Sequence, residues 1–89
     1  MASRLYHVHI TVAAQKQLDS LPVRDQVRIR EAIDSLANEP RPRGCKKLKG
    51  STDTWRIRVG NYRVIYEVHD NQLLVLVVEI GHRKDVYRP

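Results

Sequence analysis

The side chains of this chain best suited to chemistry are three arginines in one stretch of alternating residue types: Arg56, Arg58 and Arg63. Between them, Gly60 and Asn61 can form a two-residue turn, which is the pattern of a β-hairpin. In that register Arg58 lies directly opposite Arg63, and Arg56 is on the same face. Like charges directly opposite each other destabilise a sheet, so a fold that keeps this pair indicates a bound anion. We interpret this face as a phosphate site; the alternative is a solvated basic strand face.

The other face of the same hairpin is apolar, and we expect it to face the helices. It carries Trp55, Ile57, Val59, Tyr62, Val64 and Tyr66. On this pattern Trp55 belongs to the core and is not a platform for stacking a nucleobase.

Positive charge is concentrated in the second half of the chain, which has a formal net charge of +6. Residues 1–40 hold five basic and five acidic side chains, whereas residues 41–63 hold eight basic and one acidic. This concentration favours a polyanionic partner, either nucleic acid or an acidic protein segment. A membrane surface is disfavoured, because the basic residues fall on predicted strands and loops and not along an amphipathic helix.

The length and the cysteine content limit the architecture. A chain of 89 residues can bury one core, so we expect a single domain over 1–89 with any site on its surface or in a shallow cleft. Cys45 is alone, and no cluster of Cys and His has metal-ligand spacing, so neither a disulfide, a metal nor another cofactor is expected. His7 and His9 are expected to be exposed strand residues. No signal peptide or membrane span is recognisable, which predicts a cytoplasmic protein.

Hydrophobic periodicity predicts an α+β fold in the order β-α-α-β-β-β, with two N-terminal helices packed on one face of an antiparallel-rich sheet. The expected elements are a strand over 4–10, a helix capped by Thr11 and ending near Leu18, a helix from Pro22 to about Ala37, a short strand over 46–49, the hairpin over 55–68 and a strand over 73–80. The second helix has a predicted apolar stripe of Val23, Val27, Ile29, Ile33, Leu36 and Ala37.

The last strand is apolar on both faces, as expected of a central strand. A two-residue turn at Asp70 and Asn71 would place three of its side chains on the face of Arg63: Leu74, Leu76 and Val78. The cations would then rise from an apolar floor, where a lower local dielectric constant strengthens their hold on phosphate.

Three motifs in this order of elements carry a resemblance to a known family. They are KKLKG at 46–50, WRIRVGNYRVIYEV at 55–68 and IGHRKDVYR at 80–88. Together they closely resemble the RelE toxins of toxin–antitoxin modules, within the wider RelE/ParE superfamily. The resemblance implies a ribosome-dependent endoribonuclease that cuts mRNA without a metal, inhibits translation and is held inactive by a cognate antitoxin. It further implies that operator DNA is bound only through the antitoxin complex.

The resemblance also implies roles for individual residues. Arg63 matches the phosphate-binding arginine of the family, and Arg83 matches a second one after the last strand. Arg56 and Arg58 stand where the best-known relatives carry lysines that bind the substrate and assist proton transfer. Tyr87 matches a tyrosine that stacks on or orients the substrate base. A further group is interpreted as contacts to ribosomal RNA or a landing surface for an acidic antitoxin tail, with solubilising lysines as the alternative: Lys46, Lys47 and Lys49.

Arginine at positions 56 and 58 leaves the general base unassigned, because a guanidinium group stays protonated under nearly all conditions. His82 is a candidate, since an imidazole in a cationic neighbourhood can be neutral and accept a proton. The alternative is that His82 packs at the strand end or contacts the ribosome. Glu67 and Glu79 are carboxylates within range of the sheet, and we interpret Glu67 as a salt-bridge partner of the arginines.

Three classes of function stay open from the sequence. The arginines together with Tyr87 favour the mRNA-cleaving toxin. The second class is a ParE-like inhibitor of DNA gyrase without nuclease activity, and the third is an inactive relative that only binds another protein or operator DNA. An antitoxin is the protein partner expected from the chemistry and the family, covering the cations or displacing residues 81–89.

Overall fold

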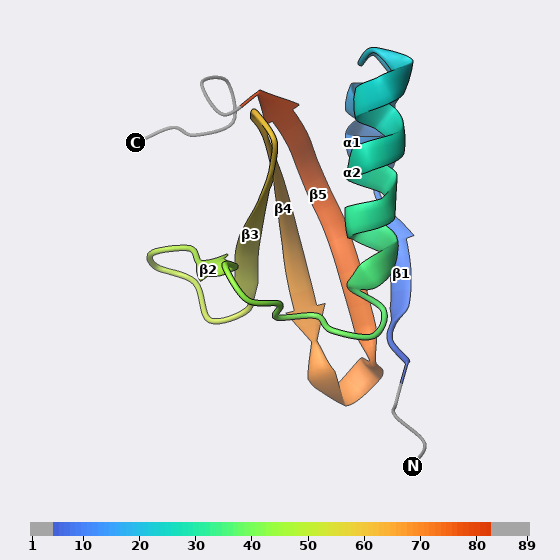
Figure 1. Cartoon of the computed structure of the whole chain (residues 1–89). Helices are drawn as coiled ribbons and strands as arrows, with labels where there is room; N and C mark the ends of the chain where they lie inside the picture. Colours follow the sequence, from blue (N-terminus) through green and yellow to red (C-terminus); the bar gives the residue numbers. More distant parts are fainter. Residues whose placement is uncertain (1–4, 83–89) are drawn as a thin grey trace.

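The computed structural model describes residues 5–82, which form two helices on one face of a five-stranded sheet (Figure 1). The elements are β1 (His7–Ile10), α1 (Val12–Asp19), α2 (Val23–Ser35), β2 (Lys46–Lys47), β3 (Thr54–Val59), β4 (Tyr62–His69), the 3₁₀ turn η1 (Asp70–Gln72) and β5 (Leu74–His82). The strand order is β1-β5-β4-β3-β2, with β1 parallel to β5 and the other pairs antiparallel. The predicted α+β architecture is confirmed.

The two helices begin where the sequence predicts. The hydroxyl of Thr11 accepts a hydrogen bond from the backbone N–H of Ala14 at 3.2 Å, which caps α1. Pro22 precedes the first residue of α2 and supplies the fixed backbone angle that a helix start favours.

The predicted apolar stripe of α2 is only partly correct. Ile29, Ile33 and Leu36 are buried, but Val23 and Val27 are 74% and 52% exposed. The prediction is wrong for both valines. Val27 lies about 200° around the helix from the buried Ile29, on the side away from the sheet. In the first half of α2, the polar residues Asp25 and Arg28 instead lie against the β3–β4 hairpin, at Tyr62 and Gly60.

The hairpin between β3 and β4 has the predicted register. Val59 pairs with Tyr62, and Arg58 pairs with Arg63. Gly60 has a φ of 60°, and Asn61 does not have a positive φ, so the turn is of type II′. Glycine suits this position because other residues rarely adopt a left-handed backbone.

The connection between β4 and β5 differs from the prediction. His69 pairs with Leu74, so the loop has four residues and not the two-residue turn expected at Asp70 and Asn71. The loop contains η1 and then Leu73 in the left-handed region, with a φ of 50°. Side chains distant in sequence hold it, because the carboxylate of Asp70 accepts hydrogen bonds from Arg41 at 3.1 and 2.8 Å and from the Tyr6 hydroxyl at 2.6 Å.

A β-bulge follows in the same strand pair. Ile65 pairs with Glu79 but Tyr66 pairs with Val77, so Val78 is the extra residue. Leu74 and Leu76 keep the predicted face, because an even shift of register preserves the alternation of side chains. Beyond the bulge the alternation is reversed, and Glu79 stands on the face where the sequence predicted Val78.

The core lies between the helices and the sheet. Its buried members are Ala14, Leu18, Ile29, Ile33, Leu36, Ile57, Val64, Tyr66, Val68, Val75, Val77 and Ile80. Tyr66 is fully buried, and its hydroxyl donates a hydrogen bond at 2.7 Å to the carbonyl of Pro40. The apolar face of the hairpin therefore packs on the core, as the sequence predicts, because alternate residues of β3 and β4 point toward the helices. Among residues 5–82 there is no helix with the length and apolar character needed to cross a membrane.

Candidate nucleic-acid interface

The face of the sheet opposite the helices carries the arginines predicted from the hairpin. We call it the open face. Arg58 and Arg63 are directly opposite each other across β3 and β4, and Arg56 is two residues from Arg58 on the same face. Arg63 is only 9% exposed, whereas Arg58 is exposed and Arg56 is half-buried. The open face thus holds one largely buried guanidinium group with a second, accessible one beside it.

A second pair of like charges lies next to the first. Lys46 in β2 is directly opposite Arg56 in β3. Arg56 and Arg58 are two residues apart on β3, or about 7 Å, so the two pairs form one continuous basic patch, which we call the four-cation patch: Lys46, Arg56, Arg58 and Arg63. Sequence analysis missed the second pair, because the register of β2 is set by the loop of residues 48–53. In that loop Leu48 donates to the carbonyl of Thr54 at 2.9 Å.

The other two predicted lysines are placed differently. Lys47 lies opposite Trp55 and so belongs to the other face, while Lys49 lies in the loop after β2. All three lysines are exposed. The alternation of a strand therefore divides the KKLKG motif between the two faces, and Lys46 is its member on the open face.

Trp55 belongs to the core side of the sheet, as predicted. It lies opposite Tyr66 and packs against the core cluster. The guanidinium group of Arg41 lies 5.2 Å from the centre of its ring, within the range of a cation–π contact. Arg41 also pairs with Asp70, and this bond, followed by the bond from Tyr6, lowers the pKa of the Asp70 carboxyl to about 2. Arg41 is thus engaged in joining loops and is not part of the four-cation patch.

His82 is not brought together with the arginines. It pairs with Tyr62, which faces the helices, and the two rings meet edge to face at 5.8 Å and 77°. The hydroxyl of Tyr62 in turn donates at 3.0 Å to Asp25 of α2, and this bond is the main reason that the pKa of Tyr62 is raised. His82 therefore lies on the opposite face from Arg63, a position that supports the alternative in which it packs at the strand end. Arg83 and Tyr87 lie outside the described residues.

The carboxylates of the open face do not match the sequence interpretation. Glu67 is 2.9 Å from the Nε2 atom of His69, so its ion pair is with this histidine and not with the arginines. Glu79 lies opposite Ile65, two residues along β5 from Gly81, which is the partner of Arg63. Of these two carboxylates, Glu79 is therefore the one beside the four-cation patch.

The predicted apolar floor is not beneath the arginines. Leu74 and Leu76 lie opposite His69 and Glu67, toward the other end of β4, because the longer loop and the bulge together shift the register. Both leucines are half-buried. The neighbour of Arg63 on β5 is Gly81, which offers no side chain between the guanidinium group and a ligand.

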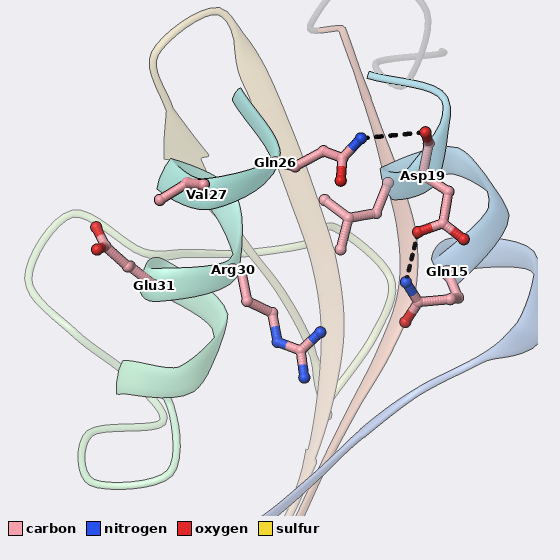
Figure 2. Close-up of a pocket in the computed structure, with 7 residues that line it drawn as sticks. Gln15, Asp19, Gln26, Val27, Arg30 and Glu31 are labelled. Atoms are coloured by element: carbon pink, nitrogen blue, oxygen red, sulfur yellow. Dashed lines mark hydrogen bonds between the residues drawn. The ribbon is translucent and has the colours of Figure 1, made fainter. Parts of the chain in front are cut away.

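A groove between α1 and α2 lies on the helical side of the molecule, away from the open face (Figure 2). Its volume is about 330 Å³, and it is lined by Gln15, Leu18, Asp19, Gln26, Val27, Arg30 and Glu31. Much of its polar lining is already bonded. Gln15 donates to the Asp19 carboxylate at 2.9 Å, and Gln26 donates to the Asp19 backbone carbonyl at 3.1 Å. Arg30 pairs with Asp34, four residues later on the same helix, at 3.4 Å. The bond from Gln26 joins α2 to α1, whereas the other two lie within α1 and within α2.

No group of three or more His, Cys, Asp or Glu side chains in the described part of the chain could hold a metal ion. The four-cation patch presents cations and hydrogen-bond donors on the open face. Arginine presents several N–H groups in a planar fork that fits the oxygens of a phosphate. The geometry suits the binding of phosphodiester groups.

Comparisons with known proteins agree on one family. Residues 8–87 match the model of the ParE toxin of the type II toxin–antitoxin system parDE. The chain is 32% identical to toxin RelG of Mycobacterium tuberculosis over 84 residues, covering 93% of this chain and 97% of that protein. It is 33% identical to toxin RelE of the same organism over 84 residues, covering 93% and 87%. A crystal structure of an archaeal RelE–RelB complex from Pyrococcus horikoshii OT3 superposes with a TM-score of 0.80 at 36% identity, covering 89% of this chain and 96% of that one. The chain therefore belongs to the RelE-type toxins of the RelE/ParE family of type II toxin–antitoxin systems.

Proposed function

We propose that this toxin is a ribosome-dependent endoribonuclease that cleaves mRNA and so inhibits translation. The observation that supports it most is the four-cation patch, with Arg63 largely buried at its β4 end. Like-charged cross-strand pairs reduce the stability of a free sheet, and a polyanion removes this cost when it binds. The RelE name of one of these relatives agrees with this activity.

The proposed reaction is attack of a ribose 2′-hydroxyl on the adjacent phosphate, with departure of the 5′-oxygen. Negative charge develops on the phosphorane, and Arg63 is proposed to stabilise it because its donors are fixed by burial. Arg58 and Arg56 are proposed to bind and orient the phosphate oxygens. The resemblance extends the same expectation to Arg83 and Tyr87.

Proton transfer needs a group that the guanidinium groups do not provide. Glu79 stands on the open face beside Gly81, the partner of Arg63, and we propose it as the proton acceptor in preference to His82. A carboxylate oxygen is one of the side-chain groups that can accept a proton in general base catalysis.

The proposed protein partner is a cognate antitoxin. The Pyrococcus horikoshii relative was crystallised as a RelE–RelB complex, and a basic open face suits an acidic segment of such a partner. In this proposal the toxin acts in the cytoplasm, where it meets ribosomes and mRNA, and it reaches operator DNA only within the antitoxin complex.

The test compares transcripts after expression of the wild type, Arg63→Ala and Arg63→Lys. Removing one donor that stabilises a developing oxyanion costs about 10²–10³ in rate, so primer extension should show cuts within translated codons that disappear in Arg63→Ala. Arg63→Lys should keep part of the activity, because it retains the charge without the fork. The matched control is Arg30→Ala, since Arg30 lies in the groove between the helices and pairs with Asp34.

The second candidate is a ParE-like inhibitor of DNA gyrase, and the family model that matches the chain favours keeping it. That function predicts intact transcripts, stalled complexes of gyrase with DNA and a DNA-damage response. Growth arrest with intact messages, unchanged by Arg63→Ala, would refute the nuclease proposal.

A further inference from the structure

Arg28 of α2 lies over the tip of the β3–β4 hairpin. A Cβ atom added to Gly60 would be 3.0 Å from its NH2 atom, 3.3 Å from NH1 and 3.4 Å from Cζ. The two contacts with the nitrogen atoms are tighter than ordinary van der Waals contact, so a side chain at position 60 would require the guanidinium group to move by a few tenths of an ångström. Glycine therefore suits position 60 for two reasons. It adopts the left-handed backbone of the turn, and it leaves room for the guanidinium group of Arg28 beside the hairpin.

The start of α2 is attached to the hairpin at the same place. Asp25 precedes Arg28 by three residues, so the two side chains lie on neighbouring positions of one helix face. The carboxylate of Asp25 accepts the hydrogen bond from the Tyr62 hydroxyl at 3.0 Å. In Figure 1 the start of α2 and the tip of the hairpin lie at the same end of the molecule. This bond fixes the start of α2, the helix that carries the exposed Arg28, beside the hairpin.

No carboxylate among residues 5–82 forms an ion pair with Arg28. Within residues 5–82 its guanidinium group makes no hydrogen bond or ion pair, whereas Arg30, on the same helix, pairs with Asp34. An exposed guanidinium group without a carboxylate keeps its donors available to a ligand. Arg28 is thus a cation available to an anion, held at a defined point of the surface.

The position of Arg28 continues the four-cation patch. Gly60 follows Arg58 by two residues, which corresponds to about 7 Å along the strand. That length is comparable with the separation of neighbouring phosphates in an extended RNA strand. The cations at Arg58 and Arg63 are on one side of the tip, and Arg28 is on the other side.

We propose that Arg28 binds a phosphate of the RNA, and that the strand bound on the open face continues over the hairpin tip to α2. The proposal rests on the proposed function, because it extends the same polyanion site. It adds a phosphate contact on the helical side of the sheet. Arg28 acts in binding and takes no part in the cleavage chemistry.

The test is a salt titration of binding to a fluorescent, single-stranded, 2′-O-methylated RNA, which lacks the attacking hydroxyl and stays intact. Each phosphate contact adds about 0.7 to the slope of log K against log salt concentration for a single strand. Arg28→Ala should reduce the slope by about 0.7, and Arg28→Lys should restore it. Arg30→Ala removes the same charge from the same helix and should keep the wild-type slope.

The outcomes separate this inference from the proposed function. Equal slopes for Arg28→Ala and Arg30→Ala would overturn the inference. This also applies if Arg28→Ala lowers the thermal unfolding midpoint, because Arg28 would then stabilise the turn without binding RNA. If Arg63→Ala weakens binding while Arg28→Ala does not, this inference alone fails. If Arg63→Ala leaves both the slope and the Kd unchanged, the open-face site fails and the proposed function fails with it.

Discussion

Replacing Arg58 by glutamine should make the free toxin more stable while weakening its function. Arg58 lies directly opposite Arg63, so the substitution removes one member of a like-charged pair and leaves Arg63 itself in place. Arg58 is exposed, and its removal leaves no cavity. The expected gain is therefore the electrostatic repulsion between the two side chains.

The size of this gain follows from the geometry. Opposite residues of a strand pair have Cα atoms about 5 Å apart, and flexible side chains let the guanidinium groups separate to about 7 Å. Two unit charges at about 7 Å repel by about 0.6 kcal/mol at the dielectric constant of water and about 2.4 kcal/mol at an effective value of 20. A Debye length of about 10 Å at 0.1 M salt reduces these values by about half. We expect Arg58→Gln to raise the free energy of unfolding by about 0.3–1 kcal/mol, within the range of measured cross-strand pairs.

The assay is thermal and urea unfolding at two salt concentrations. The midpoint should rise by about 1–8 °C at 0.1 M salt, with an unchanged urea m-value. At 1 M salt the Debye length is about 3 Å, so about a tenth of the repulsion is left and the gain should nearly vanish. The matched control is Lys47→Gln, because Lys47 lies opposite Trp55 and loses the same charge without relieving a pair. An Arg58→Gln protein no more stable than Lys47→Gln at low salt would show that the repulsion argument is wrong.

Two further predictions concern stability. Tyr66→Phe should lower the free energy of unfolding by about 1 kcal/mol, because the carbonyl of Pro40 loses its buried hydrogen-bond donor. The thermal unfolding midpoint should fall by about 4–8 °C. An unchanged midpoint in calorimetry would contradict this prediction. The stability contributed by Asp70, whose pKa falls from 3.8 to about 2 in the folded state, should be complete above about pH 4. It should decrease as the pH falls toward 2, and Asp70→Asn should remove this part of the acid transition in a pH series of urea unfolding.

The hairpin could be predicted from the sequence because residues close together in the chain determine it. Gly60 and Asn61 mark a short turn, and once the turn is placed the alternation of a strand pair fixes which side chains face each other. The opposition of Arg58 and Arg63 followed from that rule and is confirmed. The same local logic identified Thr11 as the cap of α1.

The two features of the fold that were predicted wrongly are the β4–β5 loop and the register of β5. The loop depends on contacts between residues that are distant in sequence. Asp70 is held by Arg41 and Tyr6, which stabilise a four-residue loop where a two-residue turn was expected. The bulge at Val78 reverses the alternation near the end of β5, and no residue type there signals it. These two effects moved the leucines away from Arg63 and placed His82 on the helical face.

In the proposed function, the paired cations let one surface bind two different ligands. In the free toxin the two members of each like-charged pair repel each other. A partner that places negative charge between them reduces this repulsion. RNA phosphates and the carboxylates of an acidic antitoxin segment both meet that requirement. In the proposed function the two ligands compete for the same guanidinium groups, so inhibition requires no change in the fold of the toxin. A ligand that binds the folded state stabilises it by mass action, and the relief of repulsion adds to this gain most strongly at low salt.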